Sequence, residues 1–138
     1  MIALQRAALW QSRGVFIFFV AVGCALGGIC RYLGMTAVSR LCGEAFPWGT
    51  LAVNAVGSFL LGLVLGVDLL GSEAFEIHAF AAIGFCGGLT TFSTFSLQNL
   101  TLVSQQKWMP AAWNIFGSAL LCVFCVLSGY AIGEGVLA

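Results

Sequence analysis

The stretch GFCGGLTTFSTFSLQN, residues 84–99, places glycines, hydroxyls and phenyl rings inside an apolar region of the chain. Seven consecutive positions from Thr90 to Ser96 carry five hydroxyl groups and two phenyl rings, those of Phe92 and Phe95. The edge of a phenyl ring is the positive part of its quadrupole, and a hydroxyl donates a hydrogen bond. Together they can hold an anion without a formal positive charge, and weakly enough to release it, as an ion pathway requires.

Ser93 and Thr94 stand beside the two rings and are the first candidates for the hydroxyl donors. The three-residue spacing of Phe92 and Phe95 puts the rings on one helix face, which taken alone is more typical of core packing. Both interpretations, core and anion pathway, remain open at this point.

Two glycines precede the hydroxyl-rich segment. Gly87 and Gly88 each weaken a helix by about 1 kcal/mol relative to alanine, and Thr90 and Thr91 follow closely. We therefore expect a break in this helix. Inside a bilayer, non-helical backbone is tolerated only where it is buried in protein or lines a cavity. Freed carbonyl oxygens, gathered at a dimer axis, would suit a small cation.

Two further polar stripes lie in other apolar segments. Thr50, Asn54 and Ser58 follow one another at intervals of four residues, and Asn114 and Ser118 are also four apart. Such residues often form hydrogen bonds between transmembrane helices. They also mark hydrated or ion-bearing tracks, because polar groups at membrane depth are costly.

The elements that must position these residues are transmembrane helices. Of the 138 residues, 61% are hydrophobic and 7% are charged, against roughly 45–50% and 25% in soluble domains. A transmembrane helix needs about 20 mostly apolar residues, and four segments meet that length: residues 15–38, 48–67, 78–103 and 110–133. The sequence predicts an all-α integral membrane fold, one four-helix domain over residues 1–138, with the third helix broken in mid-membrane.

Small residues spaced four apart predict close helix packing in each span, since small side chains let helix backbones approach. They are Gly23 and Gly27; Ser58, Gly62 and Gly66; Gly84 and Gly88; and Gly129 and Gly133.

Positive charges flank the spans almost evenly. With four spans, Arg6 and Arg13 fall on one side, Arg40 and Lys107 fall on the other, and Arg31 lies near the end of the first span. Because Lys and Arg in short loops set orientation, a chain with this balance is compatible with both orientations and with an antiparallel homodimer. The formal net charge of zero gives no reason to expect a nucleic-acid partner. Membrane lipid is the expected surrounding.

The residues needed for catalysis are not brought together by the pattern. His78 is the single histidine, at the start of the third span, with no nucleophile placed beside it. Asp68, Glu73, Glu76 and Glu134 fall at loops or helix ends, which places none of these four carboxylates in mid-membrane. We therefore expect no enzymatic activity.

Four motifs resemble those of the Fluc (CrcB) family of small fluoride channels, across nearly the whole chain. They are GGICRYLG, WGTLAVNAVGSFLLG, the highly specific GFCGGLTTFSTFS, and the weaker FGS of the fourth span. The resemblance implies a fluoride-selective channel that passively exports cytoplasmic fluoride across the inner (plasma) membrane and protects the cell. It also implies an antiparallel, dual-topology homodimer with two pathways. The alternative is a small dual-topology multidrug-type proton-coupled antiporter, which normally needs an embedded carboxylate.

The resemblance assigns roles by motif position. Phe92 and Phe95 are similar to the phenyl rings that line the family's fluoride pathways, and Asn54 to its pore-facing amide. The implied polar track contains Ser93, Thr94 and Ser118.

The resemblance also implies a bound metal ion. The carbonyls of Gly87 and Thr90 would coordinate a central structural sodium ion (Na+) from both subunits, and Arg31 resembles an arginine near the aqueous end of the first helix. Gln98 stands where many relatives carry Glu, and Cys122 where some carry Thr. These two departures put a carboxylate in the vestibule, and part of the track in the fourth span, in doubt.

Overall fold

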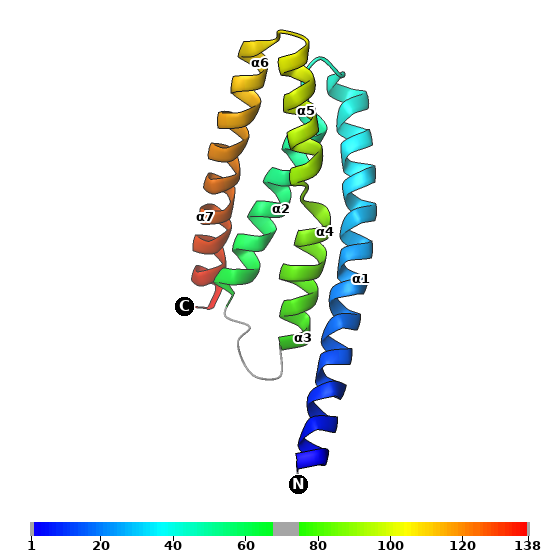
Figure 1. Ribbon diagram of the computed structural model, residues 1–138. Coiled ribbons are helices and arrows are strands. Elements are labelled where there is room, and N and C mark those ends of the chain that lie inside the picture. Colours follow the sequence, from blue (N-terminus) through cyan, green and yellow to red (C-terminus); the bar gives the residue numbers. More distant parts are fainter. Residues whose placement is uncertain (1, 68–74, 138) are drawn as a thin grey trace.

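The structure, a computed structural model, describes residues 2–67 and 75–137, and the side chains of residues 13–67 and 77–135. The described chain is helical apart from short connections (Figure 1). Four segments are long and apolar enough to cross a membrane: Arg13–Cys42, Trp48–Gly66, Ala79–Ser104 and Trp108–Gly135. They confirm the predicted all-α class with four membrane-spanning helices.

The first two helices are continuous. Helix α1 spans Ile2–Cys42 and α2 spans Trp48–Gly66. Helix α1 extends beyond the predicted span, residues 15–38, at both ends, because the preceding Ala, Leu, Gln and Arg residues are good helix formers and continue the helix past its apolar part. Gly43 ends α1 with a φ of +78°, and its N–H donates to the carbonyl of Ser39 at 2.9 Å.

The other two spans are each built from several helical pieces. The third contains α3 (Phe75–His78), the π-helical η1 (Ala79–Cys86), α4 (Gly87–Leu89) and α5 (Phe92–Ser104). The fourth contains α6 (Trp108–Ala112), the π-helical η2 (Trp113–Gly117) and α7 (Ser118–Leu137). The two π-helical turns were not predicted. Such wide turns commonly lie at functional sites.

The third span is broken, as predicted, but not at the glycines. Gly87 has helical dihedrals (φ −64°, ψ −36°) and begins α4. The extended residues are Thr90 (φ −81°, ψ 155°) and Thr91 (φ −147°, ψ 120°). The break therefore lies just after the glycine pair, where side chains described below take the place of helical hydrogen bonds.

The helices associate in two glycine-lined pairs, which confirms the close packing predicted from small-residue spacing. In the first pair, a Cβ on Gly23 of α1 would lie 2.6 Å from the carbonyl oxygen of Phe80 in η1. In the second, a Cβ on Gly62 of α2 would collide with the carbonyl of Val126 in α7. Only residues without a side chain permit these backbone contacts.

The positive charges lie at opposite ends of the bundle. Arg40 in the last turn of α1 and Lys107 before α6 belong to the two connections at one end, and the N-terminal part of α1, with Arg13, is at the other (Figure 1). Arg6 and the acidic residues of the loop after α2 lie outside the described side chains.

Candidate functional site

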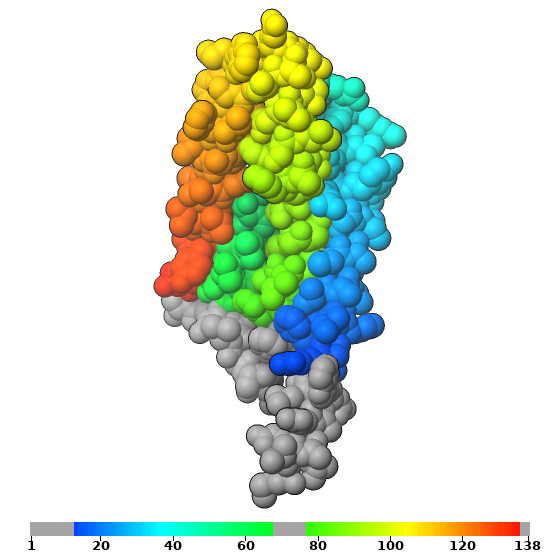
Figure 2. Space-filling view, viewed as in Figure 1, coloured from blue at the N-terminus to red at the C-terminus, as the bar shows by residue number. Residues whose placement is uncertain are grey.

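A cavity of about 430 Å³ lies between α2, the third span and α7. In the space-filling view, α2 lies recessed between those two neighbours (Figure 2). The lining side chains described by the structure carry no formal charge. The residues are Asn54, Ser58, Leu61, Ala82, Cys86, Gly87, Thr90, Thr91, Phe92, Phe95, Ser118, Ala119 and Cys122.

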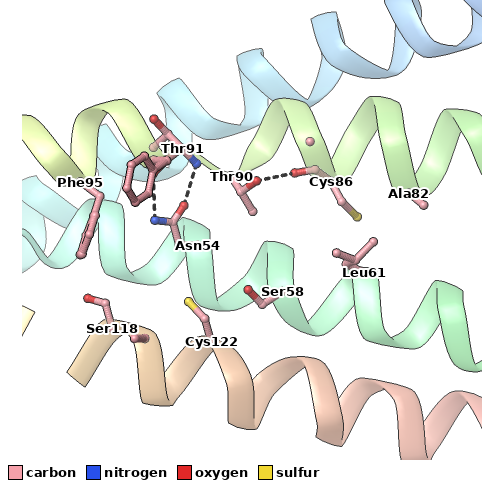
Figure 3. A pocket seen from close by; sticks show the side chains of 13 residues that line it. Asn54, Ser58, Leu61, Ala82, Cys86, Thr90, Thr91, Phe95, Ser118 and Cys122 are labelled. Carbon is pink, nitrogen blue, oxygen red and sulfur yellow. Dashed lines mark hydrogen bonds between the residues drawn. The ribbon is translucent and has the colours of Figure 1, made fainter. Parts of the chain in front are cut away.

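Asn54 of α2 holds the broken backbone in place (Figure 3). Its Nδ2 donates to the carbonyl of Thr91 at 3.1 Å, and its Oδ1 accepts from the N–H of Thr91 at 2.8 Å. One amide side chain thus satisfies both backbone groups of an extended residue that would otherwise be unpaired in the membrane. Gly57, one turn further along α2, makes room for the Thr90 side chain, because a Cβ there would collide with its methyl group.

Thr91 is also the N-cap of α5. Its Oγ1 accepts from the N–H of Thr94 at 3.2 Å, the bond that a capping threonine makes with the third helical residue. The same hydroxyl donates to Thr94 Oγ1 at 3.0 Å and lies 3.3 Å from Ser93 Oγ. The hydroxyls of Ser93 and Thr94 are therefore gathered around Thr91.

The break leaves the carbonyls of α4 and of its C-cap Thr90 without their helical donors, and those of Gly87 and Thr90 are the two predicted to hold a cation. In an unbroken helix the N–H of Thr91 would donate to Gly87 and that of Thr94 to Thr90, but Asn54 and Thr91 receive them instead. Both carbonyl oxygens are hard donors that suit a small cation. Arg31 Nη1 already donates to the Thr90 carbonyl at 3.2 Å. That oxygen has a second lone pair, so the carbonyl oxygens of Gly87 and Thr90 fit a cation that lies beside the guanidinium of Arg31.

The two predicted phenyl rings lie together in the cavity wall. The ring centroids of Phe92 and Phe95 are 5.8 Å apart, with the planes tilted by 37°. Phe95 is half-buried, whereas Phe92 is 79% exposed on the protomer. Both rings belong to the first four residues of α5, and the partial positive charge at a helix N-terminus favours anions.

A buried chain of hydrogen bonds reaches the cavity from the fourth span. Asn114 Nδ2 donates to Asn99 Oδ1 at 2.8 Å, and Ser118 Oγ donates to Asn114 Oδ1 at 3.2 Å. All three side chains are buried. This connection between α5 and the fourth span fits the interhelical bonding that was one of the two interpretations of the Asn114 and Ser118 stripe.

The structure brings most of the predicted residues to one place. Those that line the cavity are Phe92, Phe95, Asn54, Ser118, Gly87 and Thr90. Ser93 and Thr94 are not among the lining residues, and Arg31 reaches the site through the Thr90 carbonyl. Gln98 lies apart, lining a second cavity of about 290 Å³ together with Glu44 and Lys107.

Thr91, Ser58 and Cys86 also line the cavity. Ser58 was predicted only as part of the polar stripe of the second span, and Thr91 and Cys86 were not predicted as site residues. A signal for Thr91 was present, because threonine is a favoured N-cap residue and Thr91 directly precedes the helical run that begins at Phe92. Ser58 belongs to the polar stripe of α2, one turn beyond Asn54. No sequence pattern distinguishes Cys86 from a cysteine in an apolar helix.

A four-helix membrane protein whose broken third span opens onto an uncharged, hydroxyl- and phenyl-lined cavity belongs to the class of small ion-conducting membrane proteins. Residues 18–130 match the family described as CrcB-like protein, Camphor Resistance (CrcB). This chain belongs to that family.

Curated relatives cover most of the chain. The fluoride-specific ion channel FluC of Hahella chejuensis is 43% identical over 123 residues, 88% of this chain and 96% of the relative. The proteins of that name from Shewanella sediminis and Magnetococcus marinus are each 42% identical, over 82% and 86% of this chain and 91% and 97% of their own lengths.

Proposed function

We propose that this chain is a fluoride-specific ion channel that passively exports cytoplasmic fluoride across the bacterial inner membrane and protects the cell from fluoride toxicity. Relatives that carry this name align over nearly their whole length. The observation on which the proposal rests is the uncharged cavity beside the break, where Phe92, Phe95 and Asn54 meet. The antiporter alternative is not supported, because the described side chains that line the cavity include no carboxylate.

The cavity suits a strongly hydrated halide in transit. Fluoride must exchange its water for donors, and the site offers the second N–H of Asn54, the first-turn amides of α5 and the ring edges of Phe92 and Phe95. None of these groups carries a full positive charge, so the ion is stabilised without being trapped. Flux then follows the electrochemical gradient. Fluoride that enters as the neutral acid and dissociates inside leaves by this route.

The functional unit in this proposal is an antiparallel, dual-topology homodimer with two pathways. The 79% exposure of Phe92 supports it, since a pathway wall of one protomer needs cover. A Cβ on Gly87 would meet nothing within 4 Å, which leaves the surface beside the freed carbonyls open to a second copy. The even distribution of positive charges supports insertion in both directions.

Gly87 and Thr90 would hold a structural sodium ion through their carbonyl oxygens, from both copies of the chain. Bound there, the ion would neutralise carbonyl dipoles that have lost their helical donors and would link the two subunits. The loss of their helical donors supports this assignment, and the Thr90 carbonyl, which accepts from Arg31, keeps a second lone pair for the ion.

Ion-specific efflux tests the proposed function. Proteoliposomes loaded with potassium fluoride should release fluoride rapidly once a potassium ionophore dissipates the opposing voltage, and chloride-loaded vesicles should retain chloride. A fluoride electrode measures the release, with protein-free vesicles as control. Retention of both ions would contradict the channel assignment, and equal release of both would contradict its specificity.

The single lysine of the chain, Lys107, tests dual topology because it is exposed at one end of the bundle. A membrane-impermeant amine reagent applied to intact spheroplasts should modify about half of the Lys107 side chains, and nearly all after permeabilisation, as quantified by peptide mass spectrometry. Lys107→Arg is the control for specificity. Complete modification, or none, before permeabilisation would show a single orientation.

A further inference from the structure

Four hydroxyl side chains line the cavity, those of Ser58, Thr90, Thr91 and Ser118. A hydroxyl has one proton and therefore donates one hydrogen bond at a time. An anion accepts hydrogen bonds, so a hydroxyl serves it only if that proton is available. A hydroxyl whose proton is already bonded within the protein therefore does not donate to the ion, whereas a hydroxyl with a free proton can.

Three of the four protons are used inside the protein. Thr90 Oγ1 donates to the carbonyl of Cys86 at 3.0 Å, and Thr91 Oγ1 donates to Thr94 Oγ1 at 3.0 Å. Ser118 Oγ donates to Asn114 Oδ1 at 3.2 Å. For any of these to serve a halide, an internal bond must first break, which removes most of the gain.

The direction of the Ser118 bond is fixed by its neighbours. Asn114 Nδ2 donates to Asn99 Oδ1, so the Oδ1 of Asn114 is the atom turned toward Ser118. An oxygen that accepts cannot offer Ser118 a proton, and Ser118 must therefore be the donor. Ser118 then presents lone pairs, not a proton, to the cavity.

Ser58 differs from the other three. Within the described part of the chain its Oγ has no hydrogen-bond partner, and it is not one of the oxygens buried without a partner, so it is open to the cavity it lines. It lies one helical turn from Asn54 on α2, and Figure 3 places both side chains along the same stretch of the cavity. The hydroxyl of Ser58 and the amide of Asn54 thus line the same cavity one helical turn apart.

We propose that Ser58 is the hydroxyl that donates to the halide, next to Asn54, because the proton of Ser118 is already bonded to Asn114. The inference rests on the proposed fluoride channel function and deepens it. It also changes the expected polar track, because it moves the donor role from Ser118 on the fourth span to Ser58 on α2.

Fluoride efflux from proteoliposomes tests this with matched variants. Ser58→Ala should slow efflux by about tenfold or more, the effect of a lost hydrogen bond to a charged group. Ser58→Cys should slow it similarly, because a thiol of nearly the same size is a weak donor. Ser58→Thr keeps the hydroxyl and should stay within about threefold of the wild type, as should the matched control Ser104→Ala, an exposed serine of α5 that does not line the cavity. Each variant is first shown to elute like the wild type on gel filtration.

The fluoride concentration that gives half-maximal efflux separates binding from structure. Ser58→Ala should raise it about tenfold, and Ser104→Ala should leave it unchanged. Wild-type efflux in Ser58→Ala, failure of Ser58→Thr to restore it, or an equal loss in Ser104→Ala would each overturn the inference while leaving the channel function intact. A wild-type protein that releases no fluoride would overturn both.

Discussion

The variant Asn54→Asp changes one atom of the side chain that holds the break. The Nδ2 that donates to the Thr91 carbonyl at 3.1 Å becomes an oxygen, and the Oδ1 that accepts from the Thr91 N–H at 2.8 Å is kept. At neutral pH the ionised side chain faces that carbonyl without a proton to donate. It also places a negative charge on the wall of the cavity.

The expected loss of flux has two sources. A buried carbonyl left without its donor costs about 1–3 kcal/mol, which loosens the break. A halide about 5 Å from the new charge, at an effective dielectric constant of about 20, is repelled by roughly 3 kcal/mol. Since about 1.4 kcal/mol is a factor of ten, occupancy of the pathway should fall by about two orders of magnitude from the charge alone.

Acid should reverse the effect. Protonation gives a neutral carboxylic acid with one acceptor oxygen and one O–H donor, which copies both bonds of the Asn54 amide and removes the charge. Proton binding is favoured at low pH, so fluoride efflux from the variant should rise as the pH falls. The wild-type rate should change less, because no Asp, Glu, His or Lys is among the described residues that line the cavity.

The assay is efflux at constant fluoride activity across a pH series, with the leak of protein-free vesicles subtracted at each pH. Asn54→Leu is the matched control, since it removes both hydrogen bonds without adding a titratable group and should be slow at every pH. Wild-type flux in Asn54→Asp at neutral pH would refute the placement of Asn54 in the pathway. A slow, pH-independent variant would refute the electrostatic explanation.

Three further variants test other parts of the structure. Phe95→Ile keeps apolar volume but loses the ring edge, and fluoride efflux should fall about tenfold, the equivalent of ~1.4 kcal/mol; an unchanged rate would count against the ring. Gly62→Val forces a side chain against the backbone of α7 and should destabilise the fold by about 1–3 kcal/mol in detergent thermal unfolding, whereas Gly135→Val, with nothing within 4 Å, should not. Arg31→Gln keeps a donor for the Thr90 carbonyl but removes the positive charge beside the proposed sodium site. Less sodium should therefore be needed to raise the midpoint of thermal unfolding. Identical responses to sodium and potassium in the wild type and the variant would contradict a cation at that carbonyl.

The four spans were predictable because crossing a membrane requires about 20 apolar residues, a property of composition and length alone. The glycine pairs were predictable from spacing, since small residues four apart let helix backbones pack closely. The π-helical turns η1 and η2 were not, because their apolar residues are equally compatible with α-helix. The extension of α1 to Ile2 was missed because hydropathy delimits a span and not the helix that contains it.

The position of the break depends on a contact between residues 37 apart in the sequence. Asn54 pairs with the backbone of Thr91, and this long-range bond, not the local glycines, decides where the helix opens. Residue type alone likewise predicted the hydroxyls of Ser93 and Thr94, beside the rings, as anion donors. In the structure these hydroxyls are gathered around Thr91. Whether a hydroxyl proton is free depends on its partners, and partners appear only in the folded chain.

The break brings a helix C-terminus and a helix N-terminus, which carry opposite partial charges, within a few residues of each other. Helix α4 ends in carbonyls that have lost their donors, which favours a cation, and α5 begins with amides that have no acceptor in the helix, which favours an anion. The Asn54 and Thr91 side chains create both ends at once, because each N–H that they capture frees a carbonyl on the other side. A change that restored the helical bonds would therefore remove the cation site and the anion-favouring helix end together. Loss of sodium-dependent stability should accompany loss of fluoride flux in any variant that closes the break.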